Sequence, residues 1–416
     1  MSHPAFSRSD LARALYDRGC PPGRAPRVVV ALPARDEAER IEPCLAALLH
    51  QRGSSIRADG AGFGIVLLAN NCRDATVPRA RDMLSSAGIP HLVVPIDLPP
   101  RLANAGVARG LALDIASLWA ARAEGPGMLL TTDADSRVSP HWVEGNLSGL
   151  SGACGAVAGR FAFDSAEESD WPPHLLRRRR IESAYEETLA ALSAQLDPLP
   201  HDPWPNHWTE SGASFALTLD AYRRIGGLPA VEAGEDRALA GALVRHDIAI
   251  RHDPAIVVTT SARFDGRAPG GCASALLQRA AQHDAPGDER LEALPAALRR
   301  MVLRSRLRKA FSVGFCPAEW ERRLRLEEGA LAGQARPRFG ESWAIALARS
   351  PLLVPQPLRP AQMEHHLTVA HRVQAALADA SRRGEEIEPI ILRALPRNEL
   401  EPLAESVDEA LDGLVA

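Results

Sequence analysis

Two aspartates, Asp133 and Asp135, follow an apolar run in the stretch "GMLLTTDADSRVSP" (residues 127–140). Such a run is typical of a short buried strand, so we expect both carboxylates in the loop where that strand ends and a helix begins. Two carboxylates in one loop can point into one site. Their hard oxygens suit Mg²⁺ or Mn²⁺, and a cation held there would neutralise charge on a leaving diphosphate. The alternative is that both aspartates only cap a turn or a helix.

The segments around these aspartates alternate between strand-like and helix-like patterns. The predicted strands are 27–34, 63–71, 91–97 and 127–135, and the predicted helices are 37–51, 74–88, 103–125 and 140–150. Gly88 is expected to end the second helix, and Ser139 is expected to cap the fourth. This alternation predicts a parallel, doubly wound α/β sheet, whose ligands bind beyond the carboxyl ends of the strands. The two aspartates would therefore face the ligand crevice.

The pattern changes after residue 150. We expect a strand at 152–163, a helix at 174–197, a Pro- and Trp-rich loop at 198–208, a strand and short helix within 211–229, a helix at 234–247, one or two strands within 248–262, and an arginine-rich loop at 263–271. From about residue 285 onward only helical periods occur. The predicted organisation is an N-terminal tail and linker (1–25), an α/β domain (26–284) and a helical C-terminal region (285–416).

Composition excludes several classes of protein. The chain has 416 residues with a net charge of −4, so it has no global basic field for nucleic acid or anionic lipid. Its six cysteines lie far apart without a CxxC pair, which favours reduced thiols in the cytoplasm. The N-terminus lacks the apolar core of a secretory signal, and no apolar run approaches the roughly 20 residues of a membrane span. We therefore expect a cytoplasmic protein.

Five segments occur in an order that carries a resemblance: "VVVALPARDEAERIEPCLAALL", "VLLANNCRDAT", "LLTTDADSRVSPHWVEGNL", "SGASFALTLDAYRRIGGLP" and "GEDRALAGAL". Together they resemble the family 2 glycosyltransferases, which have the GT-A fold, over residues 27–270. The resemblance implies transfer of a sugar from a nucleotide-diphosphate sugar to an acceptor, with inversion and with Mg²⁺ or Mn²⁺. It does not extend to the C-terminal third, and the acceptor is not readable from the sequence.

The resemblance also implies which residues bind the donor. Pro33, Arg35 and Glu37 would line the nucleotide. In the second loop the family usually has "DNGSTDGT", whereas this chain has "ANNCRDAT", so Ala69 stands where an aspartate usually contacts the base and Asn70 follows it. This departure puts the usual preference for UDP in doubt. If the loop "PARDEAER" has no binding role, its acidic residues would only favour a helix N-terminus.

Further roles follow from the same resemblance. Asp133 would face the ribose and Asp135 would hold the metal, while Arg109 would reach the phosphates or the sugar of the donor. Arg263 and Arg267 belong to a loop that would close on the diphosphate; the alternative is that both are solvated. Many metal-dependent relatives have a late histidine ligand near this loop, and "VVTTSAR" has none.

The acceptor side is expected at the "GED" segment and before the "SGAS" strand. Asp236 matches the position of the general base, with Glu235 beside it, and a base there would take the proton of the acceptor hydroxyl. The alternative is that both carboxylates only favour the first turn of a helix. His207, Trp208 and Gly212 are candidates for acceptor contacts, although Trp208 could equally pack a loop.

Two other functions stay open. The first is a catalytically silent relative that binds nucleotides or assembles with partners, with a homodimer among the arrangements considered. The second is a sugar nucleotidyltransferase, which shares this kind of sheet. The absence of glycine from "LPARDEAER" argues against the second. The intact Asp133, Asp135 and Asp236 argue against the first.

Overall fold

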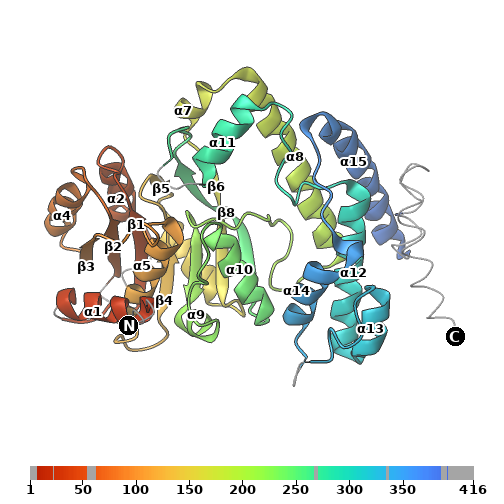
Figure 1. The fold of residues 1–416 in the computed structure, drawn as a ribbon, viewed down its shortest axis with the longest axis horizontal. Helices are drawn as coiled ribbons and strands as arrows, with labels where there is room; N and C mark the ends of the chain where they lie inside the picture. The colour runs from red at the N-terminus through yellow and green to blue at the C-terminus, as the bar shows by residue number, and fades with distance from the viewer. Residues whose placement is uncertain are drawn as a thin grey trace. The chain divides into compact units, whose positions relative to one another are not determined.

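A computed structural model describes residues 7–21, 23–53, 62–266, 270–333, 337–385 and 391. The chain forms two compact units (Figure 1). The sheet unit comprises residues 1–170, 209–243 and 248–277, and the helical unit comprises residues 171–208, 244–247 and 278–416. Every residue of the candidate site described below belongs to the sheet unit, apart from His207 and Trp208.

The sheet unit contains one eight-stranded sheet in the order β3-β2-β1-β4-β7-β6-β8-β5. Its strands are β1 (Val28–Ala34), β2 (Phe63–Asn70), β3 (His91–Ile96), β4 (Met128–Thr131), β5 (Ser136–Val138), β6 (Ala156–Phe163), β7 (Phe215–Thr218) and β8 (Ile250–Thr260). Strands β3, β2, β1 and β4 are mutually parallel, as expected. Strand β7 runs antiparallel to β4 and β6, and β5 runs antiparallel to β8. The sheet is thus parallel in its first half and mixed in its second.

Helices cover both faces of the sheet because its strands are apolar on both. Val29 and Ala31 pack on α5, whereas Val30 and Leu32 pack on the opposite helices. The first face carries α1 (Arg8–Gly19), α5 (Ala105–Ala120), α9 (Leu219–Arg224) and α10 (Glu235–Arg245); the second carries α2 (Ile41–Leu49), α4 (Thr76–Ala87) and α6 (Trp142–Leu150). The predicted doubly wound α/β fold is therefore confirmed. Two further helices are α7 (Ser165–Ser169) and α11 (Cys272–Ala281).

The helical unit is built around α8, which precedes β7 in the chain. Its long helices are α8 (Pro173–Leu196), α12 (Leu294–Val313), α14 (Phe339–Arg349) and α15 (Pro360–Arg383), with the shorter α13 (Pro317–Arg323). Tyr185 and Leu189 of α8 pack with Leu298 of α12 and Val369 of α15. The described part of the C-terminal third thus has the helical character that its periodicity predicts. Within the described residues, no helix is both long and apolar enough to cross a membrane.

Helices α2, α4, α5 and α6 all begin later than predicted, and the differences at α2 and α6 bear on the site. Helix α2 begins at Ile41, not at Glu37, because residues 36–40 form a turn in which Asp36 has a φ of 50°. Helix α6 begins at Trp142 after His141, so Ser139 is not its cap. The backbone N–H of Ser139 instead bonds to Val257, because β5 pairs with β8. Gly88 ends α4 in the left-handed conformation, as predicted.

Candidate active site

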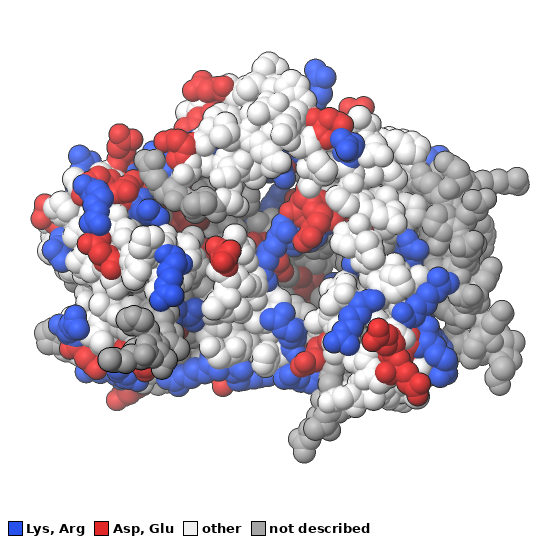
Figure 2. All heavy atoms as spheres, in the orientation of Figure 1, with Lys and Arg blue, Asp and Glu red and all other residues white. Residues whose placement is uncertain are grey.

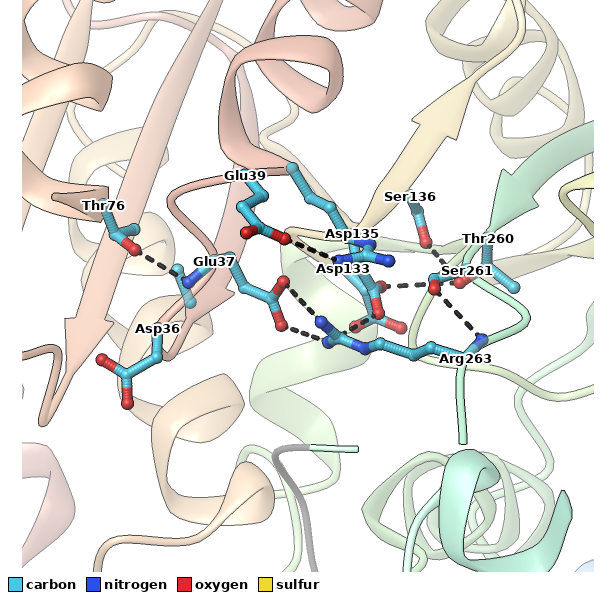
Figure 3. A network of polar contacts seen from close by, with 12 residues as sticks. Asp36, Glu37, Glu39, Thr76, Asp133, Asp135, Ser136, Thr260, Ser261 and Arg263 are labelled. Atoms are coloured by element: carbon cyan, nitrogen blue, oxygen red, sulfur yellow. Dashed lines mark hydrogen bonds and ion pairs between the residues drawn. The ribbon is translucent and has the colours of Figure 1, made fainter. Parts of the chain in front are cut away.

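Asp133 and Asp135 lie in the connection between β4 and β5, beyond the carboxyl end of β4 (Figure 3). Strand β4 pairs in parallel with β1, and β1 with β2. The segments after all three strands therefore meet at one edge of the sheet, which brings Glu37 and Asn70 to the edge that carries the two aspartates.

Glu37, Arg263 and Asp135 form an ion-pair cluster at this edge. The guanidinium of Arg263 bonds to both carboxylate oxygens of Glu37, with Nη1 at 3.0 Å from Oε2. Its Nη2 also lies 3.1 Å from Oδ2 of Asp135 (Figure 3). The side chains of Glu37 and Arg263 are 7% and 10% exposed, against 21% for Asp135. Asp135 is thus the most accessible member of the cluster.

The turn that carries Glu37 is fixed by bonds from side chains to its backbone. The N–H of Glu37 donates to Thr76 Oγ1 at 2.8 Å, and the N–H of Ala38 donates to Asp74 at 2.9 Å. Asp36 in turn accepts from the N–H of Arg73 at 2.6 Å. Asp36, Cys72 and Asp74 bring potential metal-ligand atoms within 4.8 Å of one another. Because both carboxylates already hold backbone N–H groups, we assign them to fixing this turn.

Arg109 is the centre of a second ion-pair cluster. Its Nη2 lies 2.5 Å from Asp133, and its Nε lies 3.2 Å from Glu235. Its Nη1 bonds to Thr131 Oγ1 at 2.8 Å and to the carbonyl of Gly212 at 3.0 Å. Burial disfavours the charged guanidinium, but the carboxylates of Asp133 and then Glu235 outweigh it and raise the pKa of Arg109. Arg109 is therefore a permanent cation that joins the loop after β4, the loop before β7 and the start of α10.

Arg109 makes its hydrogen bonds to protein groups, which leaves little of its guanidinium for the expected contact with the donor. The guanidinium side chain is only 6% exposed, and its nitrogens are already bonded to protein groups. Direct donor binding by Arg109 stays a prediction, whereas the bridging position is what the structure shows.

Asp236 and Glu235 lie side by side in the first turn of α10 but have different partners. Glu235 is ion-paired with Arg109. Asp236 accepts from its neighbour's N–H, that of Arg237, at 2.8 Å, and from the N–H of Gly212 at 3.4 Å. Burial, and then the charge of Glu235, raises the pKa of Asp236 above its ordinary value. Among the residues that the structure describes, Glu235 contacts a cation directly and Asp236 does not.

The electrostatics at Asp135 fit a divalent cation. Burial raises the pKa of Asp135 to about 6, and the charges of Asp133 and Glu37 add to the shift, while Arg263 and Arg40 offset it only in part. Around this edge, the four carboxylates of Glu37, Asp133, Asp135 and Glu235 face the three guanidiniums of Arg40, Arg109 and Arg263. The surplus is negative, and carboxylate oxygens are the ligands that Mg²⁺ and Mn²⁺ prefer. Asp135 would be the principal ligand.

The remaining predicted donor residues lie close to the same edge. Pro33 is part of β1, and Arg35 donates to the carbonyl of Ala103 at 3.0 Å. Asn70 ends β2, is 2% exposed, and its Oδ1 has no hydrogen-bond partner among the described residues. Arg267 lies outside the described residues. The structure therefore brings most of the donor candidates to one edge without testing their roles.

The acceptor candidates divide between the two units. His207 is buried in the helical unit, where Trp208 packs against the cluster that includes Tyr185 and Leu298. Gly212 lies in the sheet unit, against Arg109. Trp208 is thus a packing residue of the helical cluster in this structure, and an acceptor role of the three residues stays a prediction.

Sequence reasoning missed two hydroxyl groups of the site. Thr131 supports Arg109, and Thr260 lies with its Oγ1 3.5 Å from Asp135 and 3.0 Å from Ser136 Oγ. Thr131 ends the apolar strand ahead of the two aspartates, so its place there was a readable signal. Thr260 had none, because the pairing of β5 with β8 that brings it close was not predicted.

Comparisons with known proteins give a likeness of fold only. No protein-family model matches the chain, and no curated protein matches it. Similar solved structures include S. aureus TarS 1–349 in complex with UDP-GlcNAc, at 13% identity and a TM-score of 0.41, covering 86% of this chain and 92% of that chain. Another is the mannosyltransferase PcManGT from Pyrobaculum calidifontis in complex with GDP-Man and Mn²⁺, at 19% identity and a TM-score of 0.40, covering 82% and 97%. Likenesses with these TM-scores do not identify a shared site or reaction.

Proposed function

We propose that this protein is an inverting, cation-assisted glycosyltransferase of the family 2 type, which uses a nucleotide-diphosphate sugar as donor. One observation carries the proposal. Arg109 joins Asp133, in the loop assigned to the donor and the metal, to Glu235, beside the residue assigned as the base. The family resemblance assigns Asp133 and Glu235 to one reaction, although they lie far apart in the sequence. Arg109 holds both carboxylates at the same edge of the sheet.

On the donor side, the diphosphate would lie against Asp135 and the nucleoside against the turn of Glu37 and the end of β2. A Mg²⁺ or Mn²⁺ ion held by Asp135 would supply charge neutralisation for the departing diphosphate. The buried Oδ1 of Asn70 is an acceptor for a donor group of the base. The turn at Glu37 is already fixed by Thr76 and Asp74, so the nucleotide would meet a pre-organised surface.

On the acceptor side, Asp236 would take the proton of the acceptor hydroxyl as its oxygen attacks the anomeric carbon. The bond to the diphosphate breaks on the opposite face of the sugar, so one displacement inverts the anomeric configuration. Glu235 would not serve as this base, because Arg109 holds its carboxylate. The bonds from the N–H groups of Arg237 and Gly212 orient the carboxylate of Asp236.

The first experiment is a thermal-shift panel of UDP, GDP, CDP, ADP and dTDP, each with and without Mn²⁺, followed by hydrolysis assays of the matching sugar nucleotides. A specific nucleotide raises the melting temperature by mass action, and we expect Mn²⁺ to increase that shift. We expect slow hydrolysis of the same donor. A nucleotide that stabilises the protein without any turnover of its sugar would instead favour the catalytically silent relative. No shift with any nucleotide would contradict the proposal.

A further inference from the structure

Arg263 already occupies the electrostatic place of a cation at the candidate metal site. Its guanidinium is clamped by both oxygens of Glu37 and donates from the same end to Oδ2 of Asp135 at 3.1 Å (Figure 3). With a 10% exposed side chain it is withdrawn from water, so little solvent screens its charge. The pair with Glu37 alone would neutralise that buried carboxylate. The additional contact with Asp135 therefore needs its own explanation.

The carboxylate of Asp135 cannot bind the Arg263 guanidinium and a divalent metal ion at full strength at the same time. A divalent ion on its carboxylate would lie within a few ångströms of the Arg263 guanidinium, and like charges at such separations repel strongly where water is scarce. Any ion that binds there must therefore weaken the contact between Arg263 and Asp135. Glu37 opposes this movement, because its two bonds hold the guanidinium toward Asp135.

We propose that Arg263 is an internal counter-cation that competes with the divalent metal for Asp135, and that Glu37 anchors it there. This inference rests on the proposed function, since it takes Asp135 as the metal ligand. The free protein would then bind metal weakly. A nucleotide diphosphate would favour metal binding, because its negative oxygens offer the guanidinium another partner. Arg263 would thus make tight metal binding at Asp135 depend on the bound donor.

The test is a titration of the purified full chain with Mn²⁺ alone, followed by the electron paramagnetic resonance signal of free Mn²⁺. We compare the wild type with Arg263→Gln, Asp135→Asn and a matched control, Arg40→Gln. Arg40 also acts on Asp135 through its charge, but its ion pairs are with Glu39 and Glu167. Arg40→Gln therefore removes the same charge nearby without removing a contact to Asp135.

We expect Arg263→Gln to bind Mn²⁺ at least about 10-fold more tightly than the wild type, because it removes a like charge in direct contact with the ligand. Arg40→Gln should gain much less, and Asp135→Asn should bind most weakly. If binding is lost in Asp135→Asn but unchanged in Arg263→Gln, the competition is refuted while the metal assignment stands. If neither the wild type nor Arg263→Gln binds Mn²⁺ through Asp135, the metal assignment fails, and the inference fails with it.

Arg263→Gln leaves the buried Glu37 without its cation, so it could impair folding. The double variant Glu37→Gln/Arg263→Gln keeps the net charge of the wild type and removes the ion pair as a unit. It should also bind Mn²⁺ more tightly than the wild type, because the guanidinium that is lost contacts Asp135 directly, whereas Glu37 acts on Asp135 only through its charge. Wild-type affinity in a folded double variant would mean that Arg263 does not compete, and would overturn the proposal.

Discussion

Glu235 accepts a 3.2 Å hydrogen bond from Nε of Arg109, although 126 positions separate the two residues in the chain. The other side of the same guanidinium holds Asp133. A single buried cation thus fixes the start of α10 relative to the loop after β4. The distance between the assigned base and the assigned donor loop depends on it.

The first prediction concerns Arg109. We expect Arg109→Gln to lower the free energy of unfolding by about 3–5 kcal/mol, the usual cost of removing one partner from a buried ion pair. The reason is that the largely buried Glu235 would lose its cation, and the partly exposed Asp133 would lose it too. Urea denaturation measures the effect. Arg73→Gln is the control, because the pair of Arg73 with Asp97 is exposed, and exposed pairs contribute roughly 0–1 kcal/mol. Equal losses in the two variants would contradict the bridging role.

A second variant, Arg109→Lys, tests whether Arg109 positions the base for turnover in addition to stabilising the fold. Lysine keeps the charge but lacks the planar fork that reaches Asp133, Thr131 and Glu235 at once. We expect this variant, where folded, to show a lower kcat with a smaller change in the KM for the donor, because the base and Asp133 are displaced while the turn of Glu37 is still held by Thr76 and Asp74. A rise in KM alone would favour direct donor binding by Arg109 instead.

The second prediction concerns Gly212. A Cβ atom at this position would lie 2.3 Å from Cζ of Arg109, which nothing but a shift of the guanidinium or the loop can relieve. We expect Gly212→Ala to cost about 1–3 kcal/mol of stability, as overpacking usually does, and to lower turnover as well. Gly152→Ala is the matched control, since the nearest atom to its added Cβ is 3.9 Å away. If both variants keep the turnover of the wild type, the contact between Gly212 and Arg109 does not support catalysis.

The third prediction concerns the metal ligand. Asp135→Asn should keep the fold but lose most activity at limiting Mn²⁺, because a neutral amide holds and offsets a cation poorly. The melting temperature should change little, since the surplus negative charge around Asp135 also decreases in this variant. Initial rates over a Mn²⁺ series provide the measurement. Full activity of Asp135→Asn at limiting Mn²⁺ would contradict the assignment.

The sequence predicts the parallel half of the sheet well, for a physical reason. Val29 and Val30 point to opposite faces of the sheet, and both faces are covered by helices, so both residues are buried. A strand of this kind is a continuous apolar run, whereas a strand with one exposed face alternates apolar and polar residues. The pairing of β5 with β8 is not predictable in this way. Strand β5 has three residues, and its register depends on contacts with residues more than a hundred positions away.

The site is predictable in its residue types but not in its pairings. Asp133 and Asp135 are visible as two carboxylates after one strand, yet they join different clusters, one with Arg109 and one with Arg263. That division follows from packing in three dimensions. The net charge of −4 predicts no global basic field, and Figure 2 shows acidic and basic side chains interspersed over the face that it draws.

The fourth prediction concerns the loss of the base. Asp236→Asn should lower turnover by on the order of 10²–10⁴-fold, the usual effect of losing a general base. Nucleotide affinity, measured by thermal shift, should hardly change, because the bonds of Asp236 are to Gly212 and Arg237 and not to the donor turn. A variant that keeps its turnover but loses nucleotide binding would reverse the assignment of the two sides. A product with the donor's anomeric configuration would refute the single displacement.

The last prediction is the pH dependence. Burial and the charge of Glu235 raise the pKa of Asp236. A base must be deprotonated, so kcat/KM should fall as the pH decreases through this raised pKa, at a higher pH than for an exposed aspartate with a pKa near ~4. Glu235→Gln removes the neighbouring negative charge and leaves Arg109 less compensated. Both changes lower the pKa of Asp236, so the acidic limb of the profile should move to lower pH. Asp82→Asn, an exposed change on α4, should leave the limb in place. An acidic limb that is the same in Glu235→Gln and the wild type would mean that it reports a group other than Asp236.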